Sequence, residues 1–306
     1  ILQGLDVLLI DQNIKAAEAG KAKIEMLLSE SVKRKKLSEE EKIRLLKKVK
    51  TDASLENISS SDLVIEAVFE DLNLKHNLYK KIEPHLKEGA ILASNTSTLP
   101  ITKLSEVLAD STRFLGIHFF SPVDKMNLVE LIKSERTNDN ALAVALDYTI
   151  LIKKTPIVVN DSRGFYANRC IIPYINEGLR MLNEGIEPAL IENSAKQIGM
   201  PVGPLQLLDE LSVSLALNVA KETKEALGTK YEETGTESIL LEMSQKNRLG
   251  RKELAGFYEY DEKGRRLKLW EGLRNLNIEK NSAGISPVTV KNRLAYVQAL
   301  EAARAL

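Results

Sequence analysis

The sequence contains a single cysteine, Cys170, so no disulfide can form within the chain. A lone cysteine favours a reducing compartment over a secreted fold held together by disulfides. Cys170 precedes the apolar pair Ile171 and Ile172, and its basic neighbour is Arg169. We therefore expect Cys170 to pack in a core rather than to act as a reactive thiol.

An excess of charge of one sign is also lacking, because 43 basic side chains balance 43 acidic ones. This balance argues against a nucleic-acid scaffold and against a dedicated membrane-surface protein. An anionic ligand must then be met by a local basic patch. The candidate patch is the run of Lys33, Arg34, Lys35 and Lys36 at the end of an expected helix. It either docks phosphates or is an ordinary solvated helix end.

Long apolar runs are missing as well, since no stretch approaches the ~18 residues needed to span a bilayer. No signal peptide is visible. The chain begins with Ile rather than Met, so we expect that an earlier segment exists. Its 306 residues suffice for two domains, and 43% apolar with 28% charged residues is ordinary for a globular protein.

Short apolar runs alternate with helical patterns through the first half of the chain. The runs cover residues 6–11, 63–68, 90–94, 113–118, 128–132 and 156–159. Several are apolar throughout, as strands covered on both faces must be. Helical segments lie between them, for example at residues 74–86 and 140–153. This alternation predicts a mainly parallel, doubly wound α/β sheet.

The helical parts of the chain fall into two places. An insertion at residues 13–36 and 38–49 is predicted to form two amphipathic helices, the second begun by a capping box at Ser38. After residue 160 the strand signals fade, and residues 165–183 and 187–198 are predicted helices. We place a domain boundary near residue 160, with an all-helical domain over residues 161–280.

The last residues resemble the start of that helical half. Asn168, Arg169, Glu177, Arg180 and Leu182 recur at identical spacing as Asn292, Arg293, Glu301, Arg304 and Leu306. Two amphipathic helices can share a few polar positions by chance. The interpretation that we favour is an internal repeat, in which residues 281–306 begin a second, truncated copy of the helical unit. The chain would then be a piece of a longer protein.

An acid, Asp11, closes the first apolar run. In dinucleotide-binding folds an acid at the end of the second strand binds the adenosine ribose, about 20 residues after the glycine fingerprint GxGxxG begins. Counting back that far passes the first residue, so the missing fingerprint does not argue against this role. Such an acid would repel a 2′-phosphate and favour NAD over NADP. The alternative is an ordinary polar residue at a strand end.

Of the three histidines, His76 and His85 lie in a charged helical segment, whereas His118 ends an apolar run. Glu130 lies within the next apolar run, and a carboxylate buried in a strand needs a partner because an unpaired one is costly. If His118 supplies that partner, its imidazole becomes an oriented base that can take a hydroxyl proton during hydride transfer. A purely structural histidine is the alternative.

A cluster of short polar side chains, Ser-Asn-Thr-Ser-Thr at residues 94–98, follows the strand predicted at 90–94. At the carboxyl edge of a parallel sheet such residues face the ligand crevice. The alternative is capping of the helix predicted over residues 101–108. Both can hold for different residues of the cluster.

Several motifs, in order, resemble the L-3-hydroxyacyl-CoA dehydrogenase family. They are Glu-Ala-Val-Phe-Glu at 66–70, Ser-Asn-Thr-Ser-Thr at 94–98, His-Phe-Phe-Ser-Pro at 118–122, Leu-Val-Glu at 128–130 and Gly-Phe-Tyr-Ala-Asn-Arg at 164–169. Gly-Met-Pro-Val-Gly-Pro at 199–204 and Gly-Phe-Tyr at 256–258 extend the likeness over nearly the whole chain. The resemblance implies a Rossmann-type NAD-binding domain over residues 1–160, without its first strand and glycine loop, followed by the family's all-α C-terminal domain.

The truncated repeat makes the chain most similar to the dehydrogenase region of the multifunctional fatty-acid β-oxidation α-subunit. In that protein a hydratase/isomerase domain precedes the dehydrogenase, and the helical domain is duplicated. The resemblance thus implies lyase and isomerase activities elsewhere in the protein and a thiolase subunit as a partner. It also implies a bacterial cytoplasmic location, or a mitochondrial or peroxisomal one in a eukaryote. No nucleic-acid partner is expected.

The resemblance also implies residue roles in the oxidation of an L-3-hydroxyacyl-CoA to a 3-ketoacyl-CoA. His118 is the implied general base, Glu130 orients it, and Ser97 and Asn168 hydrogen-bond the reacting oxygen and the thioester region. The implied cofactor is NAD and no metal is implied. The resemblance implies that Asp11 binds the ribose of the cofactor. It implies six further cofactor-binding residues, namely Val68, Phe69, Glu70, Lys75, Ser97 and Ser121. The family has Asn where this chain has Ser121, which reaches less far.

Two alternatives remain at this point. The first is another two-domain NAD-dependent dehydrogenase that acts on a sugar acid or a short hydroxy acid. The second is a non-catalytic structural relative that keeps the fold and loses the cofactor. The joint presence of Ser97, His118, Glu130 and Asn168 argues against the second alternative.

Overall fold

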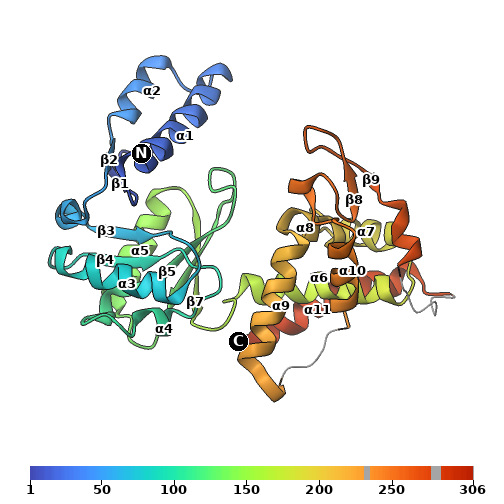
Figure 1. Cartoon of the computed structure of the whole chain (residues 1–306). Coiled ribbons are helices and arrows are strands. Elements are labelled where there is room, and N and C mark those ends of the chain that lie inside the picture. The colour runs from blue at the N-terminus through green and yellow to red at the C-terminus, as the bar shows by residue number, and fades with distance from the viewer. Residues whose placement is uncertain (231–234, 277–283, 306) are drawn as a thin grey trace. The chain divides into compact units, whose positions relative to one another are not determined.

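The computed structural model describes residues 1–230, 235–276 and 284–305. The chain divides into two compact units, Ile1–Phe165 and Tyr166–Leu306 (Figure 1). The boundary predicted between residues 280 and 281, and Leu306 of the predicted repeat, lie outside the described residues.

The first unit is built on two β-sheets. One pairs β1 (Val7–Ile10) with β2 (Val49–Asp52), and the other has the order β3-β4-β5-β6-β7. The strands of the larger sheet are β3 (Leu63–Glu66), β4 (Ile91–Ser94), β5 (Phe114–Phe119), β6 (Leu128–Lys133) and β7 (Thr155–Asn160). Every neighbouring pair is parallel except β5 and β6. This is the mainly parallel α/β sheet that the sequence predicts.

Helices cover both faces of the larger sheet, which explains why its strands are apolar throughout. The helices of this unit are α1 (Ile14–Lys33), α2 (Glu39–Leu46), α3 (Leu72–Ile82), α4 (Ile101–Ser105) and α5 (Asp139–Leu151), with 3₁₀ turns at Leu55–Ser60, Glu83–His85 and Ser111–Arg113. Residues of α3 and α4 pack with Phe114 and Ile132 on one face. Residues of α5 pack with Leu115 and Leu131 on the other face.

The inserted helical hairpin agrees with the sequence at its caps but not at its end. Ser38 and Glu41 form the predicted capping box, in which Ser38 Oγ accepts from Glu41 N and Glu41 Oε2 accepts from Ser38 N. The helix predicted to reach Val49 ends at Leu46, and the prediction is wrong for Val49, which begins β2. Val49 is buried and lies opposite Val7 in the parallel register, so strand pairing overrides the local helical pattern.

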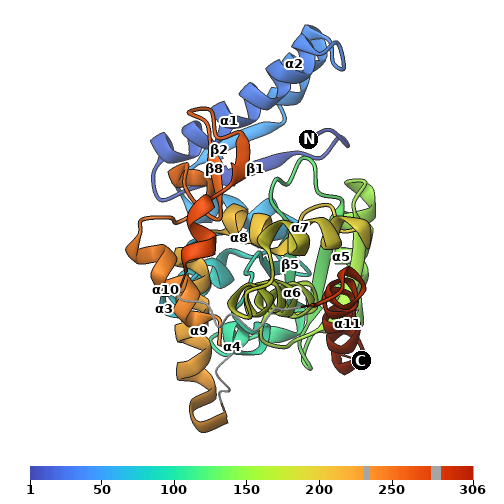
Figure 2. The same cartoon turned by 90° about the vertical axis from the view of Figure 1, so that its right-hand side faces the viewer.

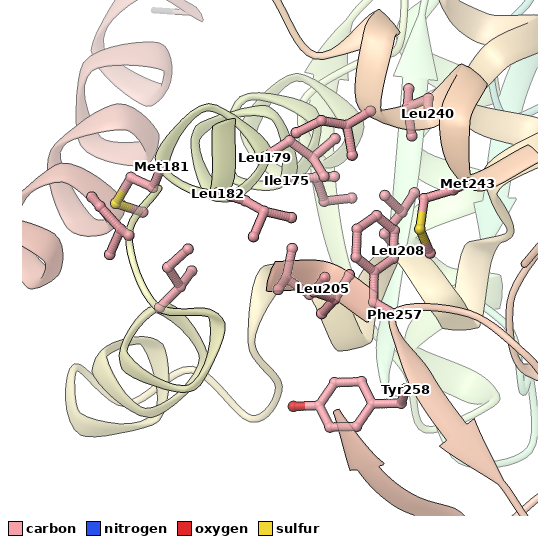
Figure 3. Close-up of a cluster of buried hydrophobic side chains, with 14 of the residues drawn as sticks. Ile175, Leu179, Met181, Leu182, Leu205, Leu208, Leu240, Met243, Phe257 and Tyr258 are labelled. Atoms are coloured by element: carbon pink, nitrogen blue, oxygen red, sulfur yellow. The ribbon is translucent and has the colours of Figure 1, made fainter. Parts of the chain in front are cut away.

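The second unit is mainly helical, as predicted. Its helices are α6 (Ala167–Asn183), α7 (Pro188–Gln197), α8 (Pro204–Leu211), α9 (Val213–Leu227), α10 (Glu237–Gln245) and α11 (Pro287–Ala305), with 3₁₀ turns at Gly228–Lys230, Arg251–Glu253 and Glu271–Asn275. It also contains an antiparallel hairpin of β8 (Tyr258–Tyr260) and β9 (Arg266–Leu269), which the sequence patterns did not reveal. Figure 3 shows Leu179, Leu205 and Phe257 meeting in the core of this unit.

The two helices of the predicted repeat, α6 and α11, pack against each other (Figures 1 and 2). Arg169 Nη2 lies 2.8 Å from Glu301 Oε1, and Arg293 Nε lies 2.5 Å from Glu177 Oε1. Arg169 and Arg293 are equivalent positions of the predicted repeat, as are Glu177 and Glu301. Exchange of equivalent partners is what a two-fold packing of two copies of one helix produces. The assignment of residues 281–306 to a second copy stays a prediction.

Candidate active site

The centre of the candidate site is a buried pair on the antiparallel strands β5 and β6. The register places His118 directly opposite Glu130. His118 Nδ1 lies 2.7 Å from Glu130 Oε2, and the two side chains are 8% and 0% exposed. The imidazole also packs against the rings of Phe120 and Phe165, with centroid distances of 4.5 Å and 6.1 Å. The strands and both rings hold the imidazole in one orientation.

The pair leaves one imidazole nitrogen for chemistry. An ionised carboxylate only accepts hydrogen bonds, so Nδ1 of His118 carries the proton that it donates to Glu130. The lone pair of His118 then lies on Nε2, for which the described part of the chain supplies no hydrogen-bond partner. An imidazole held in this tautomer can accept a proton at Nε2 while the carboxylate stabilises the resulting cation.

A second carboxylate, Glu70, fixes the loop that follows β4. Its Oε1 accepts hydrogen bonds from Thr96 Oγ1 at 2.6 Å, Ser97 N at 2.8 Å and Thr98 N at 3.0 Å. Burial on its own would raise the pKa of Glu70, but these hydrogen bonds and the charge of Lys75 outweigh it and lower the pKa. An ionised Glu70 therefore determines where the backbone of Ser97 lies.

The polar cluster at residues 94–98 serves the loop rather than the next helix. Thr96 Oγ1 accepts from Leu99 N at 3.0 Å, which is a contact within the loop. The helix α4 begins at Ile101, and its first amides donate to the carboxylate of Asp161 instead. Asn95 Oδ1 accepts from the amide of Phe119 at 2.9 Å, so the loop is tied to the strand that carries the histidine. The capping alternative considered from the sequence is not what these hydrogen bonds show.

Lys75 lies inside the unit, with a side chain that is 1% exposed. Its Nζ is 2.7 Å from Glu66 Oε1 and 3.3 Å from Glu70 Oε2. Glu66, the last residue of β3, was not selected from the sequence. It lies within the apolar run 63–68, as Glu130 lies within the run 128–132, and that shared signal could have identified it. The contact of Lys75 with the cofactor stays a prediction.

The remaining residues expected at the cofactor follow strands of this unit. Asp11 follows β1, is exposed, and accepts from the amide of Gln12 at 2.7 Å. Val68 and Phe69 follow β3 and are 39% and 87% exposed. Ser121 follows β5 and is exposed. An accessible carboxylate suits ribose hydroxyls and exposed apolar side chains suit the flat face of a ring, so this set fits NAD.

The other predicted residues belong to other elements of the chain. Asn168 is in the first turn of α6, in the second unit. The basic run that ends α1 is exposed. His76 Nε2 lies 2.8 Å from the carbonyl oxygen of Lys103 at the surface. Cys170 is partly exposed, whereas a fully packed position was expected.

Two searches of the described residues are negative. Within residues 1–230, 235–276 and 284–305 no group of three or more His, Cys, Asp or Glu side chains could hold a metal ion. No helix in the same residues combines the length and apolarity needed to cross a membrane.

The fold and the site define a dehydrogenase with a doubly wound nucleotide-binding domain. Residues 1–162 match the model of the 3-hydroxyacyl-CoA dehydrogenase NAD-binding domain, and residues 164–260 match the model of the C-terminal domain of the same family. The chain belongs to the 3-hydroxyacyl-CoA dehydrogenase family. The match to the NAD-binding domain model covers residues 1–162 of the first unit.

Individual relatives agree with this assignment. The chain is 34% identical over 280 residues to the fatty acid oxidation complex subunit alpha of Shewanella loihica, covering 92% of this chain but only 39% of that relative. It is 36% identical to the (S)-3-hydroxybutyryl-CoA dehydrogenase of Ralstonia eutropha, with a TM-score of 0.79 over 85% of this chain and 92% of that one. The dehydrogenase part of multifunctional enzyme 1 from C. elegans is 28% identical, with a TM-score of 0.69 over 99% and 69%.

Proposed function

We propose that the protein oxidises the hydroxyl group of an L-3-hydroxyacyl-CoA with NAD and that His118 is the general base of the reaction. The 2.7 Å contact between His118 Nδ1 and Glu130 Oε2 is the observation that carries this proposal. The pair lies on β5 and β6, and Asn95 of the loop that carries Ser97 accepts a hydrogen bond from the amide of Phe119 in β5. The pair leaves one basic nitrogen available in a domain that matches the NAD-binding domain of the 3-hydroxyacyl-CoA dehydrogenases.

Each residue of the site has one role in this proposal. His118 Nε2 takes the proton of the 3-hydroxyl while hydride leaves the same carbon atom. Glu130 holds the imidazole through Nδ1 and stabilises the positive charge that forms on it. Ser97 and Asn168 hydrogen-bond the reacting oxygen and the thioester region. NAD, when bound, supplies the acceptor of the hydride. Asp11 holds the ribose of the cofactor, and Val68 and Phe69 contact the cofactor from the segment that follows β3.

Replacement of the base tests the proposal. His118→Gln should lower turnover of L-3-hydroxybutyryl-CoA by about 10²-fold or more, because general-base assistance is lost. NAD affinity, measured by calorimetric titration, should stay within about twofold because Asp11 and its neighbours are untouched. Near-normal turnover by this variant would contradict the role of His118.

A comparison of oxidants tests the substrate. Reduction of acetoacetyl-CoA by NADH should be far faster than reduction of small 3-keto acids that lack CoA. Equal or faster turnover of the small acids would instead support a dehydrogenase of short hydroxy acids.

The wider setting is part of the same proposal. We propose that the chain acts within a multifunctional β-oxidation protein that also has hydratase and isomerase activity, and that a thiolase subunit binds this protein in the bacterial cytoplasm. The similarity to a fatty acid oxidation complex subunit alpha supports this setting. Hydration of a 2-enoyl-CoA by the full-length protein, and its co-purification with thiolase activity, are the expected results. Dehydrogenase activity without either would restrict the protein to the single oxidation.

A further inference from the structure

A buried carboxylate with no part in the proposed chemistry lies beneath the site. Glu66 accepts four hydrogen bonds, from Val68 N at 2.7 Å, Lys75 Nζ at 2.7 Å, Tyr79 Oη at 2.6 Å and Ser94 Oγ at 2.8 Å. Its side chain is fully buried. Two carboxylate oxygens offer about four acceptor sites, so the acid is saturated. Saturation with one cation among the donors is what makes an ionised carboxylate tolerable in a core.

Two routes of contact lead from Glu66 to the loop that carries Ser97. In the first, Lys75 bridges Glu66 and Glu70, and Glu70 holds the backbone amides of Ser97 and Thr98. In the second, the hydroxyl of Ser94 donates to Glu66 and accepts from the amide of Thr96 at 3.2 Å. The first route ends on Ser97 and Thr98 and the second on Thr96, so together they reach residues 96–98.

The balance of charge explains why the first route needs Glu66. One ammonium group, that of Lys75, lies between two carboxylates and is closer to Glu66 than to Glu70. Without the negative charge of Glu66, the ammonium would move toward Glu70, its remaining counter-ion. Glu70 accepts the loop through Oε1 and Lys75 through Oε2, so a shift of its carboxylate displaces the loop.

We propose that Glu66 is a positioning residue, which acts through Lys75 and Ser94 to hold Ser97 where the substrate oxygen is bound. The assignment rests on the proposed function for the role of Ser97, and on the contacts above for the hold on the loop. This role also gives a reason for the burial of Lys75, which links Glu66 to Glu70. From the sequence, Lys75 was expected to contact the cofactor.

The first test is Glu66→Gln in the full-length protein, which keeps the shape of the side chain and removes its charge. Hydrogen exchange of the ligand-free protein should accelerate in the peptide covering residues 95–99, while peptides covering β5 and β6 keep their protection. Turnover of L-3-hydroxybutyryl-CoA should fall about tenfold or more, since small misplacements of site groups cost up to about 10²-fold. The isotope effect of a 3-deuterated substrate should rise, because hydride transfer becomes more fully rate-limiting.

A matched control is Glu192→Gln in the second unit, another buried acid that accepts from a tyrosine hydroxyl and a backbone amide. It should lower the melting temperature but leave the exchange of residues 95–99 and the isotope effect unchanged. If Glu66→Gln does the same, Glu66 is only a structural acid and the proposal is wrong. Uniformly faster exchange across the first unit would overturn it in the same way.

A milder variant covers the case in which Glu66→Gln does not fold. Tyr79→Phe removes one of the four donors and keeps the ring that packs edge-on against Phe114 at a centroid distance of 5.3 Å. It should raise exchange at residues 95–99 and lower turnover by about twofold to threefold, the worth of roughly half a kcal/mol of lost orientation. Wild-type values in both measurements would overturn the proposal. If the unmodified protein has no dehydrogenase activity, the proposed function fails, and the exchange experiment still tests the hold of Glu66 on the loop.

Discussion

The two units bury acids in different ways. In the first unit Glu66 and Glu130 are each hydrogen-bonded to a basic group, the ammonium of Lys75 and the imidazole of His118. In the second unit Glu192 and Asp209 accept from neutral groups, namely backbone amides and tyrosine hydroxyls. Burial raises the pKa of both acids of the second unit, that of Asp209 to about 6.

In the second unit the backbone at two glycines passes very close to the carboxylates of Glu192 and Asp209. A Cβ atom at Gly256 would lie 2.0 Å from Asp209 Oδ1, and one at Gly203 would lie 2.3 Å from Glu192 Oε1. The chain comes this close because Asp209 accepts from the amide of Phe257 and Glu192 accepts from the amide of Leu205. The nearby cation Arg248 donates to the carbonyl groups of Gly256 and Tyr258 and pairs with Glu259. Glu192 and Asp209 therefore anchor a loop and a hairpin, whereas Glu66 and Glu130 hold an ammonium group and a base.

The largest expected effect separates the two kinds of acid by activity. Glu130→Gln should lower turnover about 10²-fold, about 2.7 kcal/mol of barrier, because the imidazolium loses its counter-charge. Glu192→Gln should leave turnover per folded molecule unchanged. Steady-state rates corrected for the folded fraction measure both. Equal losses in the two variants would remove the distinction.

The next effect concerns the close backbone approach in the second unit. Gly256→Ala should lower the free energy of unfolding by about 2 kcal/mol, because its methyl group collides with Asp209. In an Asp209→Ala background the same substitution should cost much less, since the colliding oxygen is gone. Urea unfolding of the wild type, the two single variants and the double variant measures the difference. An equal cost in both backgrounds would show that the methyl group does not collide with Asp209.

The pH dependence of stability should have opposite signs for Asp209 in the second unit and Glu70 in the first. The pKa of Asp209 rises to about 6 on folding, so its stabilising contribution is present below its unfolded pKa of about 4 and is lost as pH rises through 6. Relative to Asp209→Asn, the wild type should lose on the order of 2 kcal/mol between about pH 4 and pH 7.

Glu70 in the first unit provides the contrast. Its pKa is lowered on folding, so its contribution is present above the unfolded pKa and is lost as pH falls through the folded one. Unfolding curves against pH for Asp209→Asn and Glu70→Gln check both signs. Parallel curves for the two variants would show that Asp209 and Glu70 do not differ in this respect.

The smallest expected effect lies at an ion pair that is partly open to solvent. Arg169→Ala should lower the free energy of unfolding by less than about 1 kcal/mol, because Arg169 and Glu301 are 29% and 16% exposed. Arg293→Ala should cost more, since Arg293 contacts both Glu177 and Glu184. Chemical denaturation measures both losses. A larger loss for Arg169→Ala than for Arg293→Ala would show that the number of ion pairs at each position does not determine its contribution to stability.

The sequence predicted those features that depend on local pattern. Continuous apolar runs located the strands β3 to β7, because a strand covered on both faces needs such a run whatever its neighbours are. An acid within an apolar run indicated a buried partner for Glu130, and His118 lies 2.7 Å from it. The capping box at Ser38 was equally local.

Features that depend on distant partners were missed. Val49 joins a strand because of Val7, and Asp209 is bonded to amides 48 and 49 positions away. The link from Glu66 to Ser94 spans 28 positions. No periodicity within a short window carries that information. The burial of Lys75 was missed for the same reason, since a lysine is rarely buried unless it is paired.

A double-mutant cycle of His118→Gln and Glu130→Gln tests the central claim most directly, namely that Glu130 acts on the reaction through His118. Turnover of L-3-hydroxybutyryl-CoA is measured for the wild type, both single variants and the double variant. If the two residues act as one unit, the double variant should be no slower than His118→Gln alone. Multiplication of the two losses would mean that they act independently, and the account of this pair would be contradicted.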